Sequence, residues 1–182
     1  MTKQRRVKMK GAIVQCLGDL VKSNFGNDKW EKSLETAGMS KTTFFTPIQN
    51  VDDEKVMKII ESLCKVANIS PAQASDAFGE YWVNVYAPKV YSSYFKGASS
   101  SKEFILKMDG IHDAVTKNIP NAHPPRFEYE WKGDQTMIIK YKSNRGLIDI
   151  LMGLVKGVGK YYKEDLKVSK LSNDRLQVIF PK

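Results

Sequence analysis

The stretch that decides the fold is Phe127–Tyr141, FEYEWKGDQTMIIKY, in which hydrophobic and polar residues alternate on both sides of a glycine. A period of two places alternate side chains on one face of a strand, and Gly133-Asp134 is typical of a hairpin turn. The hydrophobic residues at this spacing are Phe127, Tyr129, Trp131, Met137, Ile139 and Tyr141. We therefore predict an antiparallel β-hairpin over this stretch.

The residues after the hairpin predict one long helix and two more strands. The helix covers Leu147–Tyr162 and carries small residues at Gly153, Gly157 and Gly159, which allow a close approach by a neighbouring element. The strands cover Leu166–Lys170 and Arg175–Phe180. The C-terminal part is therefore expected to be a small antiparallel sheet of about four strands with a long helix against it.

The residues before Pro124 have the three-and-four spacing of amphipathic helices instead. Carboxylates in a first turn stabilise a helix dipole, so Asp52, Asp53 and Glu54 indicate a helix start rather than a catalytic carboxylate pair. Tyr91–Ser101 is expected to be a loop. The fold class is α+β. The predicted helices cover Met9–Phe25, Asn27 to about Gly38, a segment from Val51, Ser70-Pro71 to Pro88, and Ser101 to Pro120.

Length and composition indicate a folded domain with an excess of positive charge. The 182 residues suit one domain, and 42% hydrophobic with 27% charged residues is unlike a disordered chain. The formal net charge is +9, which makes nucleic acid, anionic lipid or an acidic ligand possible partners. Because five of the basic residues crowd positions 3–10, we attribute much of this excess to an N-terminal arm rather than to a binding face.

Targeting and redox signals favour the cytoplasm. Cys16 and Cys64 each lie in a hydrophobic helical pattern without a second ligand at metal spacing, so buried free thiols are expected. The apolar run after the basic start is interrupted by polar residues, which argues against a secretory signal. No stretch approaches the roughly 18 apolar residues of a membrane span, so no membrane insertion is expected.

Few residues suggest chemistry by themselves. His112 lies on the apolar side of its helix, where a lone histidine is more often a core residue than a ligand. Tyr141, Ser143 and Arg145 point the same way from an extended chain and together suit a carboxylate or phosphate, although an exposed strand end is the simpler interpretation. No nucleophile with a base partner and no glycine-rich phosphate loop occurs. The sequence therefore does not predict an enzyme.

Six short motifs, taken together and in order, resemble the H-NOX family of haem nitric oxide/oxygen binding domains. The resemblance runs from Met9 to about Phe180, and residues 1–8 are expected to be a basic extension. It implies one haem domain over 9–182, with a helical lobe at about 9–68, a haem-ligating lobe at about 69–182, and the haem between them. The motifs are Met9-Lys10-Gly11, Thr46-Pro47-Ile48, Val51-Asp52-Asp53, Met108-Asp109-Gly110-Ile111-His112, Pro124-Pro125-Arg126 and Tyr141-Lys142-Ser143-Asn144-Arg145-Gly146-Leu147.

The resemblance also implies roles for individual residues. His112 is similar to the proximal ligand of a b-type haem iron (iron protoporphyrin IX), and Tyr141, Ser143 and Arg145 to the clamp on the haem propionates. Pro125 matches a proline that packs against the porphyrin. Oxygen-binding members carry a distal tyrosine at the position of Ile150. The positions matching the distal wall are Ile13, Leu17, Trp82, Val83, Ile150 and Leu154, among which only the Trp82 indole can donate a hydrogen bond.

The function implied is a haem-based sensor that binds nitric oxide, and also carbon monoxide, while disfavouring oxygen. Nitric oxide would weaken the iron bond to His112, the two lobes would shift, and a separate protein would read the change. A histidine kinase, a cyclic-di-GMP enzyme or a chemotaxis receptor is consistent with the family. Two alternatives remain: a non-haem pocket for a carboxylated ligand, and a basic nucleic-acid-binding module, against which Glu128 and Glu130 argue because they repel phosphates.

Overall fold

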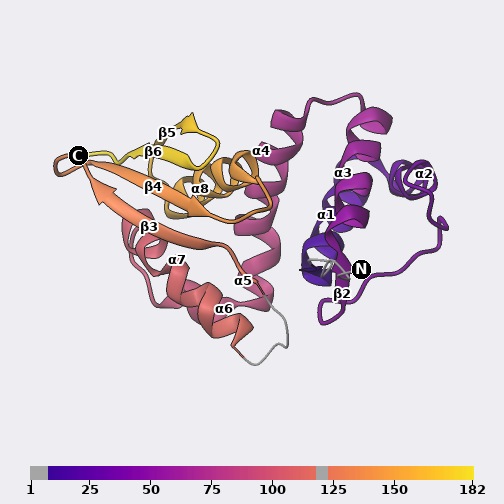
Figure 1. The fold of residues 1–182 in the computed structure, drawn as a ribbon, viewed down its shortest axis with the longest axis horizontal. Coiled ribbons are helices and arrows are strands. Elements are labelled where there is room, and N and C mark those ends of the chain that lie inside the picture. Colours follow the sequence, from indigo (N-terminus) through magenta and orange to yellow (C-terminus); the bar gives the residue numbers. More distant parts are fainter. Residues whose placement is uncertain (1–7, 118–122) are drawn as a thin grey trace, which may run out of the picture. The chain divides into compact units, whose positions relative to one another are not determined.

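The computed structural model describes residues 8–117 and 123–182 (Figure 1). The chain divides into two compact units, Met1–Ala74 and Ser75–Lys182. Helices and antiparallel strands are both present, so the predicted α+β class is confirmed. Each unit is described by itself below.

The first unit is a three-helix layer with a two-stranded ribbon. Its helices are α1 (Gly11–Phe25), α2 (Asn27–Thr36) and α3 (Asp53–Ala67), and β1 (Lys8–Lys10) pairs antiparallel with β2 (Asn50–Asp52). Buried hydrophobic residues from all three helices form its core, and they include Val14, Val21, Leu34, Val56 and Ile59. The helices begin and end close to the predicted residues because Gly26, at a φ of +91°, separates α1 from α2.

The start of α1 corrects one prediction. Met9 and Lys10 belong to β1, so the helix begins at Gly11 rather than at Met9. The first two helical N–H groups are satisfied by the 47–49 loop, since Gly11 donates to Gln49 O at 2.8 Å and Ala12 to Pro47 O at 3.3 Å. A Cβ at residue 11 would overlap the Thr46 carbonyl, so this contact requires glycine.

The helices from Pro71 onward correct two further predictions. Pro88 was expected to end the helix that starts at Pro71, but the chain continues from α4 (Pro71–Tyr81) through a π-helical turn, η1 (Trp82–Tyr86), into α5 (Ala87–Val90). Pro88 lies at the start of α5, directly after the π-helical turn, and the helix continues through it to Val90. The predicted loop at 91–101 contains α6 (Ser92–Lys96). The remaining helices are α7 (Ser101–Thr116) and α8 (Ile148–Tyr162); the predicted stop of α7 at Pro120 lies outside the described residues.

The sheet of the second unit has the predicted hairpin at one edge. The strands β3 (Arg126–Trp131), β4 (Thr136–Lys142), β6 (Arg175–Ile179) and β5 (Lys167–Ser172) lie in that order, and all are antiparallel. Phe127 lies opposite Tyr141, and the turn contains Gly133 at a φ of +85°. Figure 1 shows the four strands, orange to yellow, beside α7 and α8. The buried core between sheet and helices includes Phe127, Met137, Ile139, Leu176, Val178, Ile105 and Val155.

The helices α4 and α8 pack with their main chains in contact. A Cβ at Gly79 would overlap the main chain of Gly153, and a Cβ at Gly153 would overlap the Ser75 carbonyl. Ion pairs flank the contact, from Lys156 to Asp76 at 2.9 Å and from Lys160 to Glu80. Gly153 and Gly157 therefore allow the close approach of α4, whereas Gly159 lies against Glu164 and Leu166.

Candidate functional site

The helix α7 carries His112 and is fixed at its N-terminus. Ser100 caps the helix by accepting a hydrogen bond from the Glu103 N–H at 3.2 Å. Ser101 is fully buried, and its main-chain N–H and hydroxyl both donate to the carboxylate of Glu164. A negative charge at this end also complements the helix dipole. The two contacts hold the start of α7 against the segment that follows α8.

The imidazole of His112 is held in an apolar environment. Its Nδ1 atom is buried and has no hydrogen-bond partner within the described part of the chain. The ring centroid lies 5.3 Å from that of Phe127. Burial lowers the pKa of His112 below the usual imidazole value, and the nearby Pro125 main chain and Asp109 carboxylate oppose this shift without cancelling it. The ring is therefore neutral at pH 7, which is the form that binds a metal ion.

An ion pair joins the helix of His112 to the first strand of the sheet. Arg126 donates to both carboxylate oxygens of Asp109, from Nε at 2.8 Å and from Nη2 at 2.5 Å. The main-chain N–H of Phe127 also donates to Asp109, at 2.9 Å. The hydrogen bond from Arg126 lowers the pKa of Asp109, so the carboxylate is ionised at neutral pH. Neither residue had a predicted role, although Asp109 lies three residues before His112 and hence on the same side of the helix.

Tyr141 lies in β4, which ends at Lys142, whereas Ser143 follows the strand and Arg145 lies in a turn, so the three residues do not share one extended stretch as predicted. Tyr141 is buried, and its ring lies 6.1 Å from Phe127 between centroids. Ser143 Oγ accepts a hydrogen bond from the Arg145 N–H at 3.3 Å. The Arg145 guanidinium donates to the carbonyl of His123 at 2.6 Å, which links it to the segment that leads into Pro125. Within the second unit, Phe127 thus lies between the rings of His112 and Tyr141, and Arg145 is bonded to the segment that leads into Pro125.

Four of the six predicted distal residues lie on two adjacent elements of the second unit. Trp82 and Val83 belong to η1, and Ile150 and Leu154 belong to α8. The two elements are joined by a hydrogen bond from Asn84 Nδ2 to the Gly157 carbonyl at 3.1 Å. The other two, Ile13 and Leu17, lie on α1 of the first unit; Leu17 is buried there and Ile13 is half-buried.

The aromatic residues of β3 are not arranged as a platform for stacking nucleobases. Phe127 is buried, and the Tyr129 hydroxyl donates to the Ile105 carbonyl of α7 at 2.6 Å. Trp131 is 37% exposed, with the ammonium of Lys102 at 4.3 Å from its ring. Because these rings pack toward the helices, the aromatic strand gives no support to the nucleic-acid alternative.

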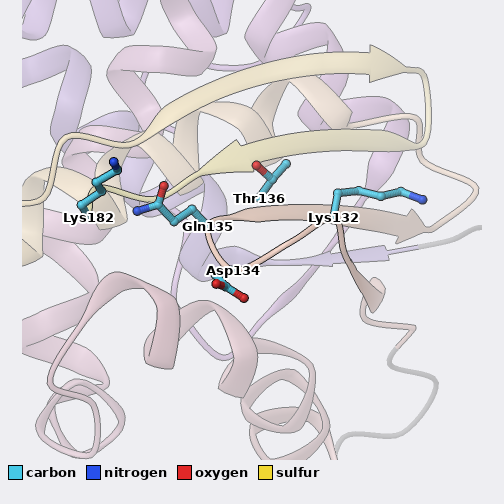
Figure 2. Close-up of a pocket in the computed structure, with 5 residues that line it drawn as sticks. All are labelled: Lys132, Asp134, Gln135, Thr136 and Lys182. Carbon is cyan, nitrogen blue, oxygen red and sulfur yellow. The ribbon is translucent and has the colours of Figure 1, made fainter.

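A surface pocket lies at the tip of the β3–β4 hairpin, away from the residues above. It is lined by Lys132, Asp134, Gln135, Thr136 and Lys182. Figure 2 shows these side chains pointing in different directions rather than toward one point. Among the described residues, no group of three or more His, Cys, Asp or Glu side chains is placed to hold a metal ion, and no helix is long and apolar enough to cross a membrane.

Comparison with known proteins gives one consistent relationship. A family model described as "Haem-NO-binding" matches residues 10–170. Soluble guanylate cyclases gcy-32 and gcy-34 of Caenorhabditis elegans are each 24% identical over 156 residues, which are 84% of this chain but only 23% of theirs. A solved oxygen-binding H-NOX domain related to soluble guanylate cyclases is 25% identical, with a TM-score of 0.82 over 96% of both chains. A mutant of Cs H-NOX that carries an unnatural amino acid has a TM-score of 0.84 at 24% identity, over 96% of this chain and 97% of that one.

Proposed function

The chain belongs to the Haem-NO-binding (H-NOX) family, whose members are haem-binding gas sensor domains, and from this we propose that it senses nitric oxide rather than oxygen. The domain is a sensor and not itself a catalyst. The observation that carries the proposal is that one chain combines two features. His112 has a neutral, buried imidazole, and Ile150 has a hydrocarbon side chain at the position where the oxygen-binding members have tyrosine.

The side chains of the second unit suit haem b. The buried, neutral imidazole of His112, whose Nδ1 has no hydrogen-bond partner in the described structure, is the expected iron ligand. The Arg145 guanidinium with the hydroxyls of Tyr141 and Ser143 provides donors for two propionates. When bound, the haem iron supplies the chemistry that binds a diatomic gas. Pro125 is proposed to pack against the porphyrin, because the same loop supplies main chain near the His112 ring.

Surrounding residues hold the proposed ligand in one orientation. The Phe127 ring packs beside the imidazole, and the Asp109–Arg126 pair fixes the strand of Phe127 to α7. Ser101 and Glu164 fix the other end of the same helix. Because Phe127 packs against the imidazole and Asp109–Arg126 ties α7 to β3, a displacement of His112 is expected to move α7 together with β3 rather than be absorbed by the side chain.

Selectivity is proposed to follow from the distal side chains. Bound oxygen is polar and is stabilised by a hydrogen-bond donor, whereas nitric oxide and carbon monoxide bind without one. Ile13, Leu17, Val83, Ile150 and Leu154 have no donor in their side chains, which leaves the Trp82 indole as the one candidate. A wall of this composition favours nitric oxide over oxygen.

The output is proposed to be a population shift that a separate protein reads in the cytoplasm. We place the haem domain over residues 9–182, with lobes at about 9–68 and 69–182 and a basic extension at 1–8. Partners consistent with the family are a histidine kinase, a cyclic-di-GMP enzyme or a chemotaxis receptor. The C. elegans relatives show the same kind of domain within a protein that carries a cyclase.

The test is an absorption spectrum of the purified protein, reduced without oxygen and then exposed to nitric oxide or to air. A Soret band that shifts with nitric oxide but gives no stable oxygen complex is expected. His112→Gly should remove the native iron ligation, and Ile150→Tyr should gain an oxygen complex. A stable oxygen complex in the unsubstituted protein would overturn the selectivity, and failure to take up haem at all would overturn the sensor assignment.

A further inference from the structure

Asn84 links two helices from the middle of the π-helical turn. Its side-chain amide donates to the Gly157 carbonyl of α8 at 3.1 Å and to the Glu80 carbonyl, one turn earlier on its own helix, at 3.0 Å. An asparagine amide has two N–H donors, so both are used. Asn84 is 73 residues from Gly157 in the chain, and its side chain is part-buried.

The turn that Asn84 braces is a local departure from the α-helix. The Ala87 N–H donates to the Trp82 carbonyl, five residues back, where an α-helix would use a residue four back. Relaxing this turn to a regular α-helix would shift the residues on one side of it by one position, which is about 100° around the axis. The turn therefore decides which way its own side chains point.

Trp82 is the first residue of this turn, and its side chain belongs to an aromatic cluster. Its indole stacks on Tyr86, with ring centroids 5.2 Å apart and planes 27° apart, and lies 5.8 Å from Phe78 and 6.4 Å from Tyr91. These contacts hold the indole in an aromatic cluster made of Phe78, Trp82, Tyr86 and Tyr91. Holding the ring there restricts where its N–H can point.

We propose that Asn84 is a positioning residue that keeps the π-turn docked on α8 and so holds the Trp82 indole in the aromatic cluster, away from bound gas. This inference rests on the proposed function, because the indole is the one hydrogen-bond donor among the distal candidates. The neighbouring glycine contact, in which a Cβ at Gly157 would approach the Gly79 carbonyl at 2.5 Å, fixes α4 to α8 just before the turn. Asn84 extends that fixed contact into the turn itself.

Removing the Asn84 side chain is expected to release the Trp82 indole N–H, which is the hydrogen-bond donor that the other distal side chains lack. In Asn84→Ala, the π-turn loses its bond to α8, and Trp82 is freed to move out of the cluster. A freed indole N–H can stabilise bound oxygen, so the variant should form an oxygen complex that lasts about tenfold longer, the equivalent of one hydrogen bond. Oxygen selectivity would then depend on a residue that does not itself reach the gas.

The first experiment uses the haem-free protein. The indole N–H signal of Trp82, assigned by comparison with Trp82→Phe, should shift and broaden in the NMR spectrum of Asn84→Ala, and the Ala87 amide should exchange with deuterium faster. The signals of Trp30 and Trp131 serve as internal references. Asp76→Asn is the matched control, because it breaks a contact between the same two helices, the ion pair with Lys156, without touching the turn.

The second experiment repeats the comparison in the haem-loaded protein, with the lifetime of the oxygen complex as the readout. If the haem-free signals of Trp82 and Ala87 are unchanged in Asn84→Ala, the inference is wrong whatever the haem does. If they change but no haem is bound, the proposed function fails while the positioning role stands. Asn84→Asp, which keeps the size but removes both donors, provides the same test if the alanine variant does not fold.

Discussion

Arg126 donates two hydrogen bonds to the carboxylate of Asp109, at 2.8 and 2.5 Å, and the main chain beside Arg126 donates a third through the Phe127 N–H. One carboxylate thus joins α7 to β3 at two points of the strand. The side chain of Asp109 is 25% exposed and that of Arg126 is 51% exposed. Because water solvates the guanidinium more than the carboxylate, Asp109 depends more on the ion pair than Arg126 does.

Removing the Asp109 side chain should destabilise the protein more than removing the Arg126 side chain. Asp109→Ala leaves the Phe127 N–H without its acceptor as well as breaking the ion pair, and we expect a loss of about 2 kcal/mol in the free energy of unfolding. Arg126→Ala leaves that acceptor in place and should cost less, because an exposed cation contributes little. Urea unfolding of the haem-free variants measures both. An equal loss in the two variants would contradict the part assigned to the Phe127 N–H.

The glycine contact between α4 and α8 predicts a large difference between two glycine substitutions. Gly153→Ala places a methyl group into the Ser75 carbonyl, and we expect a loss of about 3 kcal/mol or more because main chain must move. Gly110→Ala, on the exposed side of α7 with no atom within 4 Å of the added Cβ, should instead stabilise by about 0.5–1 kcal/mol. Thermal unfolding checks both. Tolerance of Gly153→Ala would mean that the helices are not in main-chain contact.

The contact between Ser101 and Glu164 at the start of α7 predicts that removing the Ser101 hydroxyl destabilises the protein. Ser101→Ala removes a buried donor to Glu164 and leaves that carboxylate short of a partner, so we expect a loss of about 1–2 kcal/mol in the free energy of unfolding. The control is Ser93→Ala, at an exposed position of α6, which should change stability by less than about 0.5 kcal/mol. If both variants unfold at the same denaturant concentration as the parent, Ser101 does not anchor the helix.

The raised pKa of Tyr162 predicts that the protein loses stability at high pH. Burial raises the pKa of its phenol to about 12, against about 10 in an unfolded chain. The phenol is therefore neutral in the folded state while the unfolded chain ionises, so its contribution is complete below pH 10 and is lost as the pH rises from 10 to 12. In Tyr162→Phe this component of the pH dependence should disappear. Urea unfolding at pH 9 and pH 11 gives the change in the free energy of unfolding between the two pH values. An equal change in parent and variant would contradict the role assigned to Tyr162.

The regular elements could be predicted because each has many residues at one period. The hairpin around Gly133 shows the alternation of a half-buried strand, and α3 shows the spacing of an amphipathic helix. The ribbon of β1 and β2 could not be predicted, because three-residue strands give no measurable period and their pairing joins residues far apart in the chain. The α6 helix was missed for the same reason, since five residues carry too little pattern.

The residues of the candidate site are a prediction from the sequence motifs, and the contacts between them come only from the structure. Spacing alone left His112 as a core residue, and only the set of motifs around it suggested a ligand. What periodicity cannot supply is the contact between separate elements: Arg145 with the His123 carbonyl, or Asn84 with the Gly157 carbonyl. A π-turn has no recognised sequence signal in this chain, so the direction of Trp82 followed only from the structure.

The order of strands in the sheet bears on how the protein is made. The strand β6 lies between β4 and β5, so the inner edge of β4 has no partner until residues 175–179 have emerged from the ribosome. Until then the β3–β4 hairpin presents an unpaired edge that contains Ile138 and Ile139, which is a surface prone to association with other nascent chains. The second unit therefore completes its fold late in synthesis, and truncation before Arg175 should yield an aggregation-prone product rather than a smaller stable domain.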